Sequence, residues 1–254
     1  MSSEKKRGSR CTTALALLAL ALCSACATAP LSRPPQSGAA LPDYMHVQAE
    51  LESLAGGRLF RVDASASQVH IHVFRAGRAV ALGHNHVLTA PRVQGLLWWP
   101  WDEPGQRLAL RGAAAARFEL MLRLDELELD PPELRATLGP GWASLLSPEA
   151  VAATRRNMLG EDGLQAQRFP ELRIQGLQLL GEAPKLIGRW LLQLHGQTRL
   201  HEVPLHVQMS PQGVSVRGAF FVRQSDFGLT PFSVGGGLLA VQDELLIEFV
   251  LQGR

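Results

Sequence analysis

Three histidines are the side chains of this sequence best suited to chemistry. His84 and His86 stand two residues apart in a segment of period-two alternation, so both point to the same face of a strand. His201 shares the phase of Val203 and Leu205, which are expected to face inward. Three inward imidazoles can bind zinc or copper, hydrogen-bond the polar end of a ligand, or serve as structural residues at a turn. The sequence leaves these three interpretations open.

Other histidines are less promising, and the motifs of familiar catalytic chemistry do not occur. His70 and His72 have the opposite phase to their apolar neighbours and are expected to face solvent. His206 follows His201-Glu202 at a distance of five residues, whereas a zinc protease motif needs four. The sequence has no G-x-S-x-G motif, no glycine-rich phosphate loop and no cysteine after residue 26. We therefore expect a binding protein and not an enzyme, with no cofactor other than its ligand.

A short polar segment near the C-terminus offers groups for a polar ligand. It contains Arg223, Ser225, Asp226 and Phe227. Because arginine pairs well with phosphate, Arg223 or Ser225 is a candidate for holding a head group. The alternative is structural, a strand end followed by a Ser/Asp turn with Gly228 in the left-handed conformation.

Three tryptophans, Trp98, Trp99 and Trp101, surround Pro100. They are expected either to form an exposed patch that grips a membrane or a ligand, or to pack in the core and its rim. The second arrangement is the more common one for tryptophan.

The first 25 residues have the pattern of an export signal. A basic stretch over residues 1–10 precedes an uncharged stretch over residues 12–25, which is shorter than the about 20 apolar residues that cross a bilayer. Ser24 and Ala25 before Cys26 are similar to the bacterial lipobox, which makes Cys26 the candidate lipidation site. The alternative is plain secretion with cleavage near Ala25 or Ala27. Since Ala27 is not the aspartate associated with inner-membrane retention, we expect a lipidated chain in the periplasm, anchored at the outer membrane.

Composition divides the remainder into a tether and one domain. Residues 26–57 are expected to be a flexible tether, because the stretch 27–42 is rich in Pro, Ala and Ser without an apolar period, although residues 44–55 fit a short helix. Residues 58–254 then form the folded domain, which has no cysteine and depends on its core alone. The net charge is +2, of which the first ten residues contribute +3. The nearly neutral remainder argues against nucleic acid as a partner.

The domain alternates with period two from Phe60 onward, as strands with one buried face do. The inward phase includes Phe118, Leu120, Leu122, Leu124, Trp190, Leu192, Leu194, Val203, Leu205, Val207, Met209, Val214, Val216, Phe220, Val222, Leu245, Ile247, Phe249 and Leu251. One helical insertion interrupts the strands, first to about Leu138 and then from the predicted N-cap Ser147 to Gly160. The pattern predicts an all-β antiparallel sandwich or barrel with a helical insertion, and a barrel interior would hold packed side chains or one elongated ligand.

Four segments, in order, resemble the YceI-like family of periplasmic lipid-binding proteins. They are the strand pair from Phe60 to Ile71, MLGEDGLQAQRFPELRI (158–174), WLLQLHGQTRLHEVPLHV (190–207) and FVRQSDFGL (221–229). The resemblance covers residues 59 to 252 and implies an eight-stranded extended lipocalin-like barrel that holds an isoprenoid or a similar long-chain lipid. This chain departs from the family in its His-x-His pair, His84 and His86, in Gln224 within the last segment, and in its lipoprotein-type leader.

These expectations combine into one leading hypothesis and two alternatives. The leading one is an exported, membrane-anchored protein that sequesters or carries a long-chain lipid of isoprenoid or fatty-acyl type. Leu192 and Phe220 would line its cavity, and His84, His86 and Arg223 would orient the polar end of the lipid. The alternatives are a periplasmic metal-binding or redox-accessory protein that uses the histidine cluster, and a structural envelope protein with a filled barrel. A homodimer is compatible with the family resemblance.

Overall fold

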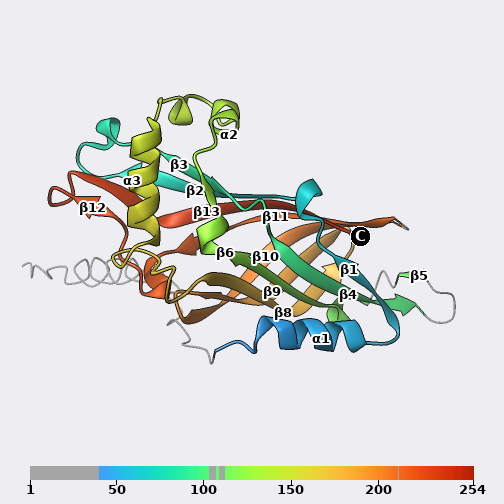
Figure 1. Cartoon of the computed structure of the whole chain (residues 1–254). Helices are drawn as coiled ribbons and strands as arrows, with labels where there is room; N and C mark the ends of the chain where they lie inside the picture. The colour runs from blue at the N-terminus through green and yellow to red at the C-terminus, as the bar shows by residue number, and fades with distance from the viewer. Residues whose placement is uncertain (1–39, 103–106, 109–111, 211) are drawn as a thin grey trace, which may run out of the picture. The chain divides into compact units, whose positions relative to one another are not determined.

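The alternating segments fold into one antiparallel β-sheet that curls into a barrel (Figure 1). The computed structural model describes residues 40–102, 107–108, 112–210 and 212–254. The predicted signal peptide, the candidate lipidation site Cys26 and the Pro/Ala-rich stretch up to residue 39 lie outside the described residues, as does the side chain of Trp101. The all-β barrel that the sequence predicts is confirmed.

The strands follow a simple order. They are β1 (Gly57–Arg61), β2 (Gln68–Ala76), β3 (His86–Thr89), β4 (Gln94–Asp102), β5 (Arg107–Leu108), β6 (Arg117–Arg123), β7 (Glu128–Leu129), β8 (Glu171–Glu182), β9 (Lys185–Leu194), β10 (Gln197–Ser210), β11 (Gly213–Arg223), β12 (Ser233–Val234) and β13 (Leu239–Gly253). The sheet runs β1-β4-β6-β8-β9-β10-β11-β13-β2-β3-β7, with β5 paired to β4 and β12 to β13. From β8 to β11 the neighbours are consecutive strands joined by tight turns, which an antiparallel sheet allows.

Within the described residues the sheet has thirteen strands, more than the eight expected. The 3₁₀ turn η1 (Ala64–Ala66) breaks the first long strand into β1 and β2. Four others, β3, β5, β7 and β12, span only two to four residues each. If β1 and β2 are counted as one interrupted strand, the remaining strands are the eight of the expected barrel. The larger number therefore comes from the break at η1 and from the four short strands.

The break in the first strand lets the barrel close. Val62 pairs with Gly253, and Arg61 and Arg254 exchange two backbone hydrogen bonds of 2.8 and 2.9 Å. On its other side β1 pairs with β4, so β1 joins the first and last long strands at this end. Closure removes the unpaired edge that an open sheet would expose there.

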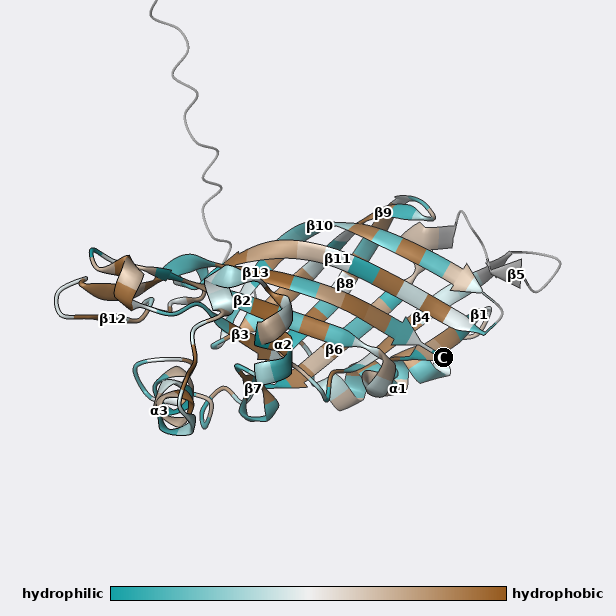
Figure 2. Ribbon diagram, turned by 90° about the horizontal axis from the view of Figure 1, so that it is seen from above, coloured by the Kyte–Doolittle hydropathy of each residue, from teal (hydrophilic) through white to brown (hydrophobic). Residues whose placement is uncertain are grey.

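The core fills the inside of the barrel, as the alternation predicts. Bands of hydrophobic and hydrophilic residues alternate along the strands (Figure 2). Leu192 and Val203 are almost fully buried, and Val207 and Val222 are nearly so. The inward phase assigned from the sequence is therefore confirmed for these strands.

One helix, α1 (Tyr44–Ser53), lies against the outside of the barrel, with the side chain of Asp43 as its N-cap. Its buried face consists of Tyr44, Val47 and Leu51, at helical spacing. Val47 and Leu51 pack on Leu96 of β4. The prediction of a flexible tether over residues 26–57 is therefore wrong for residues 44–53, because the apolar face of α1 is buried on the sheet.

The tryptophans of β4 pack in the protein. Trp99 is fully buried and faces the barrel interior, whereas Trp98 is half-buried and packs beside Val47 and Leu51 of α1. For these two residues the core-packing interpretation is correct, and alternation along one strand explains why they serve opposite faces.

The helical insertion lies where the sequence predicts it. It comprises α2 (Pro132–Thr137), the 3₁₀ turn η5 (Pro140–Trp142) and α3 (Pro148–Leu159). Ser147 caps α3 by accepting a hydrogen bond from the backbone N–H of Ala150 at 3.2 Å. None of the helices in the described residues is long and apolar enough to span a bilayer.

All of the described residues belong to one compact unit. Every described core residue lies at or beyond Tyr44. A unit with its own core folds independently, so a chain that begins at residue 35 retains everything that stabilises the barrel.

Candidate functional site

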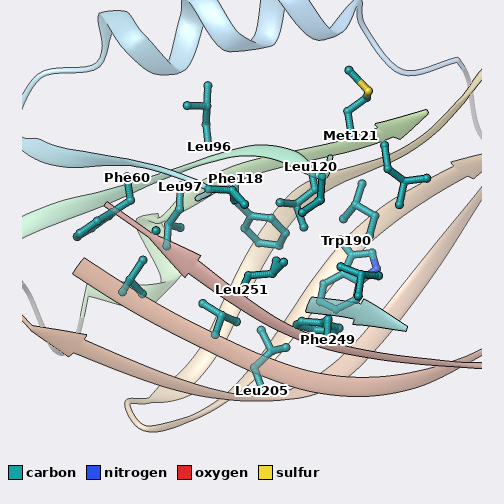
Figure 3. Close-up of a pocket in the computed structure, with 18 of the residues that line it drawn as sticks. Phe60, Leu96, Leu97, Phe118, Leu120, Met121, Trp190, Leu205, Phe249 and Leu251 are labelled. Carbon is teal, nitrogen blue, oxygen red and sulfur yellow. The ribbon is translucent and has the colours of Figure 1, made fainter. Parts of the chain in front are cut away.

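The barrel encloses an apolar cavity of about 120 Å³ near the end where β1, β4 and β13 meet. We call it the apolar chamber. Figure 3 shows Phe60, Leu97, Phe118, Leu120, Trp190, Leu205, Phe249 and Leu251 around it, while Leu96 and Met121 lie on the side toward α1. Apart from Gln252, its lining side chains are aliphatic or aromatic. Water needs two to four polar partners in a buried site, so this lining favours hydrocarbon over water.

Aromatic side chains form part of the wall of the apolar chamber. The ring of Trp190 meets Phe118 and Phe220 edge to face, with centroid separations of 6.1 and 5.5 Å. Phe220 continues the row to Phe249 at 6.3 Å. The indole nitrogen of Trp190 is buried without a hydrogen-bond partner. These contacts make the wall well packed and leave one polar atom within it unsatisfied.

A second cavity, of about 430 Å³, lies at the other end of the barrel beneath α3, and we call it the mouth chamber. Its inner wall is apolar, and its outer part carries polar side chains: His86, Thr154, Arg156, Asn157, Glu161, Asp162, Gln224 and Thr230. The apolar chamber is smaller than the roughly 300–1,000 Å³ of typical small-molecule sites, whereas the mouth chamber falls within that range.

The two chambers are neighbours along the inside of the barrel, and we call the two together the channel. Ile71, Leu172 and Ile247 line both of them. Along single strands the lining passes from one chamber to the other in steps of two residues, as from Leu192 to Leu194 on β9. Since alternate residues of a strand face the same side, the inner face is continuous and changes from apolar to polar toward α3.

His86 reaches the mouth chamber and is held by a buried carboxylate. Its Nδ1 lies 2.6 Å from Oδ2 of Asp130, which leaves Nε2 as the atom available to a ligand. The other oxygen of Asp130 accepts hydrogen bonds from Arg135 at 2.6 Å and from the backbone N–H of Val87 at 3.0 Å. Burial raises the pKa of Asp130, but the hydrogen bonds from His86, Val87 and Arg135 outweigh burial and lower the pKa below its usual value.

Arg135 of α2 connects this network to the insertion. It donates hydrogen bonds of 2.8 Å to the carbonyl groups of Asn85 and Trp142. Arg135 is itself buried, and a buried cation requires such partners. The network therefore fixes the insertion on the edge of β3 and orients His86.

The three histidines of the predicted cluster do not come together. His84 is exposed, and its Nδ1 lies 3.0 Å from Oγ of Ser144. His201 stacks on Phe227, and burial lowers its pKa. Within the described residues no three His, Cys, Asp or Glu side chains form a group that could hold a metal. The described structure therefore does not bring His84, His86 and His201 together, and the 3₁₀ turn η2 (Val80–Leu82) interrupts the strand before His84.

His72, expected in solvent, is buried instead. Its Nε2 lies 2.8 Å from Oε2 of Glu248, and the ring of Trp142 meets its ring at a centroid distance of 5.8 Å. Trp142 belongs to η5, so the insertion covers the outer face of β2 at this point. The sequence predicts correctly that His72 points away from the barrel interior. It does not predict that the insertion covers this outer face.

The polar segment at the end of β11 forms the strand end and turn that the structural interpretation predicts. Arg223 is exposed and pairs with Glu244 at 3.3 Å, and Oγ of Ser225 lies 2.5 Å from Asp243. Ser225, Asp226 and Phe227 form the 3₁₀ turn η6, which ends at Gly228 with a φ of 72°. None of these side chains lines either chamber in the described residues.

The neighbouring Gln224, together with residues of α3, occupies the position that sequence reasoning gave to Arg223. Gln224 lines the mouth chamber, as do Thr154, Arg156 and Asn157 of α3. Among the other predicted site residues, Leu192 and Phe220 lie in the wall of the apolar chamber. The signal that could have found α3 is its helical spacing, since Val151 and Met158 pack on the core and Thr154 lies between them.

Comparison with known proteins gives a likeness of fold. No protein-family model matches the chain, and no curated protein matches its sequence. The structure is similar to that of BcnA from Burkholderia cenocepacia, with 13% identity and a TM-score of 0.50 over 75% of this chain and 98% of that one. Two weaker likenesses are to a polyisoprenoid binding domain from Saccharophagus degradans (13% identity, TM-score 0.47, 77% and 97% covered) and to a Campylobacter jejuni YceI protein (8%, 0.40, 66% and 84%). The first likeness shows a shared fold.

Proposed function

We propose that this chain binds one long-chain apolar lipid inside its barrel, with the hydrocarbon in the apolar chamber and the polar end in the mouth chamber. The observation that carries the proposal is that two neighbouring chambers share lining residues and that their lining changes from apolar to polar toward α3. A ligand with the same polarity along its length matches this lining. The resemblance of four sequence segments to the YceI-like family supports an isoprenoid or fatty-acyl chain.

The binding energy would come from burying the chain. Removing apolar surface from water is worth about 25 cal/mol per Å², or about 0.8 kcal/mol for each methylene group. The apolar chamber has only Gln252 as a polar side chain in its lining, so few groups there compete for the ligand with hydrogen bonds. Affinity should therefore rise with chain length until the chamber is full.

The polar end would meet groups of both charges. Arg156 offers a cation, His86 offers Nε2, and Asn157 and Gln224 offer amides, whereas Glu161 and Asp162 are acidic. An anionic head group would be drawn toward Arg156, since guanidinium pairs well with phosphate and carboxylate. The neutral groups suit a hydroxyl or a carbonyl equally well.

The location we propose rests on the N-terminal sequence. An export signal over residues 1–25 and lipidation at Cys26 would place the barrel in the periplasm, anchored at the outer membrane. A carrier in that compartment would shield a hydrocarbon chain from water between two membranes. Binding and release would involve no covalent step.

The test is native mass spectrometry of the chain from residue 35, exported behind a cleavable signal peptide and purified from the periplasm, before and after extraction with organic solvent. We expect a stoichiometric mass of a long-chain lipid that extraction removes. Delipidated protein should then take up one equivalent of a polyprenol or a long-chain fatty acid. If the protein carries no lipid and takes up neither ligand, the carrier hypothesis is wrong and the hypothesis of a structural protein with a filled barrel takes its place.

A further inference from the structure

Two loops meet at the mouth end of the barrel. Residues 77–82 connect β2 to the segment before β3, and residues 232–238 include β12 and lead into β13 (Figures 1 and 2). The backbone N–H groups of Arg78 and Ala79 donate to the carbonyl groups of Gly237 and Leu238 at 3.0 and 2.9 Å. Gly77 permits this approach, because a Cβ there would lie 2.6 Å from the carbonyl oxygen of Leu238. The loops therefore form one joined surface.

This surface exposes large apolar side chains that contribute little to the core. Their exposed fractions are 42% for Val80, 73% for Leu82, 47% for Phe232, 43% for Val234 and 45% for Leu238. We call these five residues the apolar rim. A group of large exposed apolar side chains on two joined loops marks an interaction site more often than chance exposure does.

Within the two loops the charge has one sign, although Glu161 and Asp162 line the mouth chamber together with Phe232. Residues 75–83 and 230–241 contain Arg75 and Arg78 and no aspartate or glutamate. The guanidinium groups are held at the loops, Arg75 by the carbonyl of Gly83 at 2.9 Å and Arg78 by that of Gly236 at 3.2 Å. The rim is therefore complementary to an anionic surface.

The acidic side chains nearest to the loops along the sequence are Asp243 and Glu244. Asp243 accepts hydrogen bonds from Ser225, and Glu244 pairs with Arg223. Neither residue lies in the two loops, so the positive sign of the rim is not cancelled within them.

The apolar rim is continuous with the channel. Phe232 is exposed and also lines the mouth chamber, and Thr230 and Val241 on either side of it line the same chamber. A surface in contact with the rim would therefore lie directly beside the opening through which a lipid enters.

We propose that the apolar rim docks the mouth of the barrel onto an anionic lipid bilayer. The apolar side chains would enter the interfacial region, and Arg75 and Arg78 would lie among anionic head groups. This inference rests on the proposed function, because docking beside the opening lets a lipid pass between bilayer and channel without crossing water. It does not depend on the predicted anchor at Cys26.

The chain from residue 35 allows a clean test, since all three cysteines precede it. A single Leu238→Cys variant carries an environment-sensitive fluorophore on the rim, and Ile187→Cys carries the same label on the exposed outer wall of β9, where 46% of the side chain is exposed. With vesicles of phosphatidylethanolamine and phosphatidylglycerol, we expect a blue shift and increased emission at position 238 and no change at 187. An equal response at both positions, or none, would overturn the proposal.

Unlabelled variants give the energetic test. The double variant Phe232→Ser/Leu238→Ser should bind these vesicles about tenfold more weakly or worse, because two apolar side chains that would be buried in the bilayer are lost. The matched pair Phe221→Ser with Ile187→Ser removes exposed apolar residues from the barrel wall and should leave binding unchanged. Arg78→Glu should weaken binding to the anionic vesicles and not to pure phosphatidylcholine.

Native mass spectrometry of the same samples separates this proposal from the proposed function. Retained lipid together with unchanged vesicle binding in the rim variants would overturn docking and leave the carrier intact. Loss of lipid from every sample, with vesicle binding still dependent on the rim, would overturn the carrier alone. A change in self-association without a change in vesicle binding would reassign the rim to contacts between copies of the chain.

Discussion

Leu192 and Leu194 point to the same inner side of β9, yet Leu192 lines the apolar chamber and Leu194 lines the mouth chamber. The step of two residues carries the wall of the barrel from one chamber into the other. One uninterrupted inner face therefore joins a hydrocarbon environment to a polar opening.

The junction between the chambers should control the length of chain that binds. Leu172 lines both chambers, so Leu172→Phe should exclude long polyprenols and retain short acyl chains, at a cost in stability of about 1–3 kcal/mol for overpacking. Native mass spectrometry with a series of chain lengths measures this. Leu180→Phe, on the same strand but 37% exposed, is the control. The same chain-length cut-off in both variants would show that the ligand does not pass the junction between the chambers.

The cation at the mouth should select among head groups. Arg156 is exposed and lines the mouth chamber, so Arg156→Glu should weaken binding of a polyisoprenyl phosphate by up to about fivefold, the ratio that about 1 kcal/mol gives. Affinity for the corresponding alcohol should not change. Competition binding measures both ligands, with Arg168→Glu as a control outside the channel. An equal loss for phosphate and alcohol would assign Arg156 a structural role.

The carboxylate of Asp130, which holds His86, should contribute strongly to the free energy of unfolding. Asp130→Asn leaves Arg135 buried without its charge partner, which costs about 3–5 kcal/mol. Asparagine tolerates the φ of 54° at this position, so the backbone is not the cause. Urea unfolding measures the change, and Asp125→Asn, which removes an exposed ion pair with Arg123, should cost less than about 0.5 kcal/mol.

The same carboxylate sets a pH dependence. The pKa of Asp130 is lower in the folded protein than its ordinary value. Its contribution is therefore fully present above about pH 4 and is lost as the pH falls through the lower folded pKa. Asp130→Asn should remove this component of acid denaturation. An unchanged acid limb in the variant would show that other carboxylates cause it.

A second buried pair gives a pH dependence of opposite sign. Glu119 is fully buried beneath α1 and pairs with Arg173 at 2.5 Å. Burial raises the pKa of Glu119 to about 7, against the hydrogen bond from Arg173. The folded state thus binds a proton more tightly than the unfolded state. Stability from this group is complete below about pH 4.5 and falls until about pH 7.

Arg173 also contacts the N-terminal end of α1. It donates a hydrogen bond to the carbonyl of Pro42, and its guanidinium carbon lies 5.8 Å from the ring centroid of Tyr44.

The variant Glu119→Gln keeps a hydrogen-bond acceptor for Arg173 and removes the titrating carboxyl group. We expect the free energy of unfolding of this variant to lose the decrease between pH 5 and 7, by an amount on the order of a few kcal/mol. Urea unfolding across that range measures it, and an unaltered slope would contradict the raised pKa.

Several features of this fold were already determined by the sequence. The inner face of β9, including Leu192, follows from alternation, which is a property of residues i and i+2 in a strand. The start of α3 follows from Ser147 and Pro148, and the turn at Gly228 follows from a residue that tolerates positive φ. These signals are local, so they survive without knowledge of the rest of the chain.

Only the tertiary structure decided which segments meet. His72 has the outward phase, but Trp142 of the insertion covers it. Asp130 after β7 and Arg135 of α2 come together with His86 of β3, which is far from both in the sequence. His84 reaches this network through Ser144, whose Oγ lies 3.0 Å from Nδ1 of His84 and accepts a hydrogen bond from Arg135 at 3.1 Å. Gln224 and Arg156, which line the mouth together, are separated along the chain by four strands. A local pattern specifies a face of an element, whereas the partner of that face depends on the packing of the whole barrel.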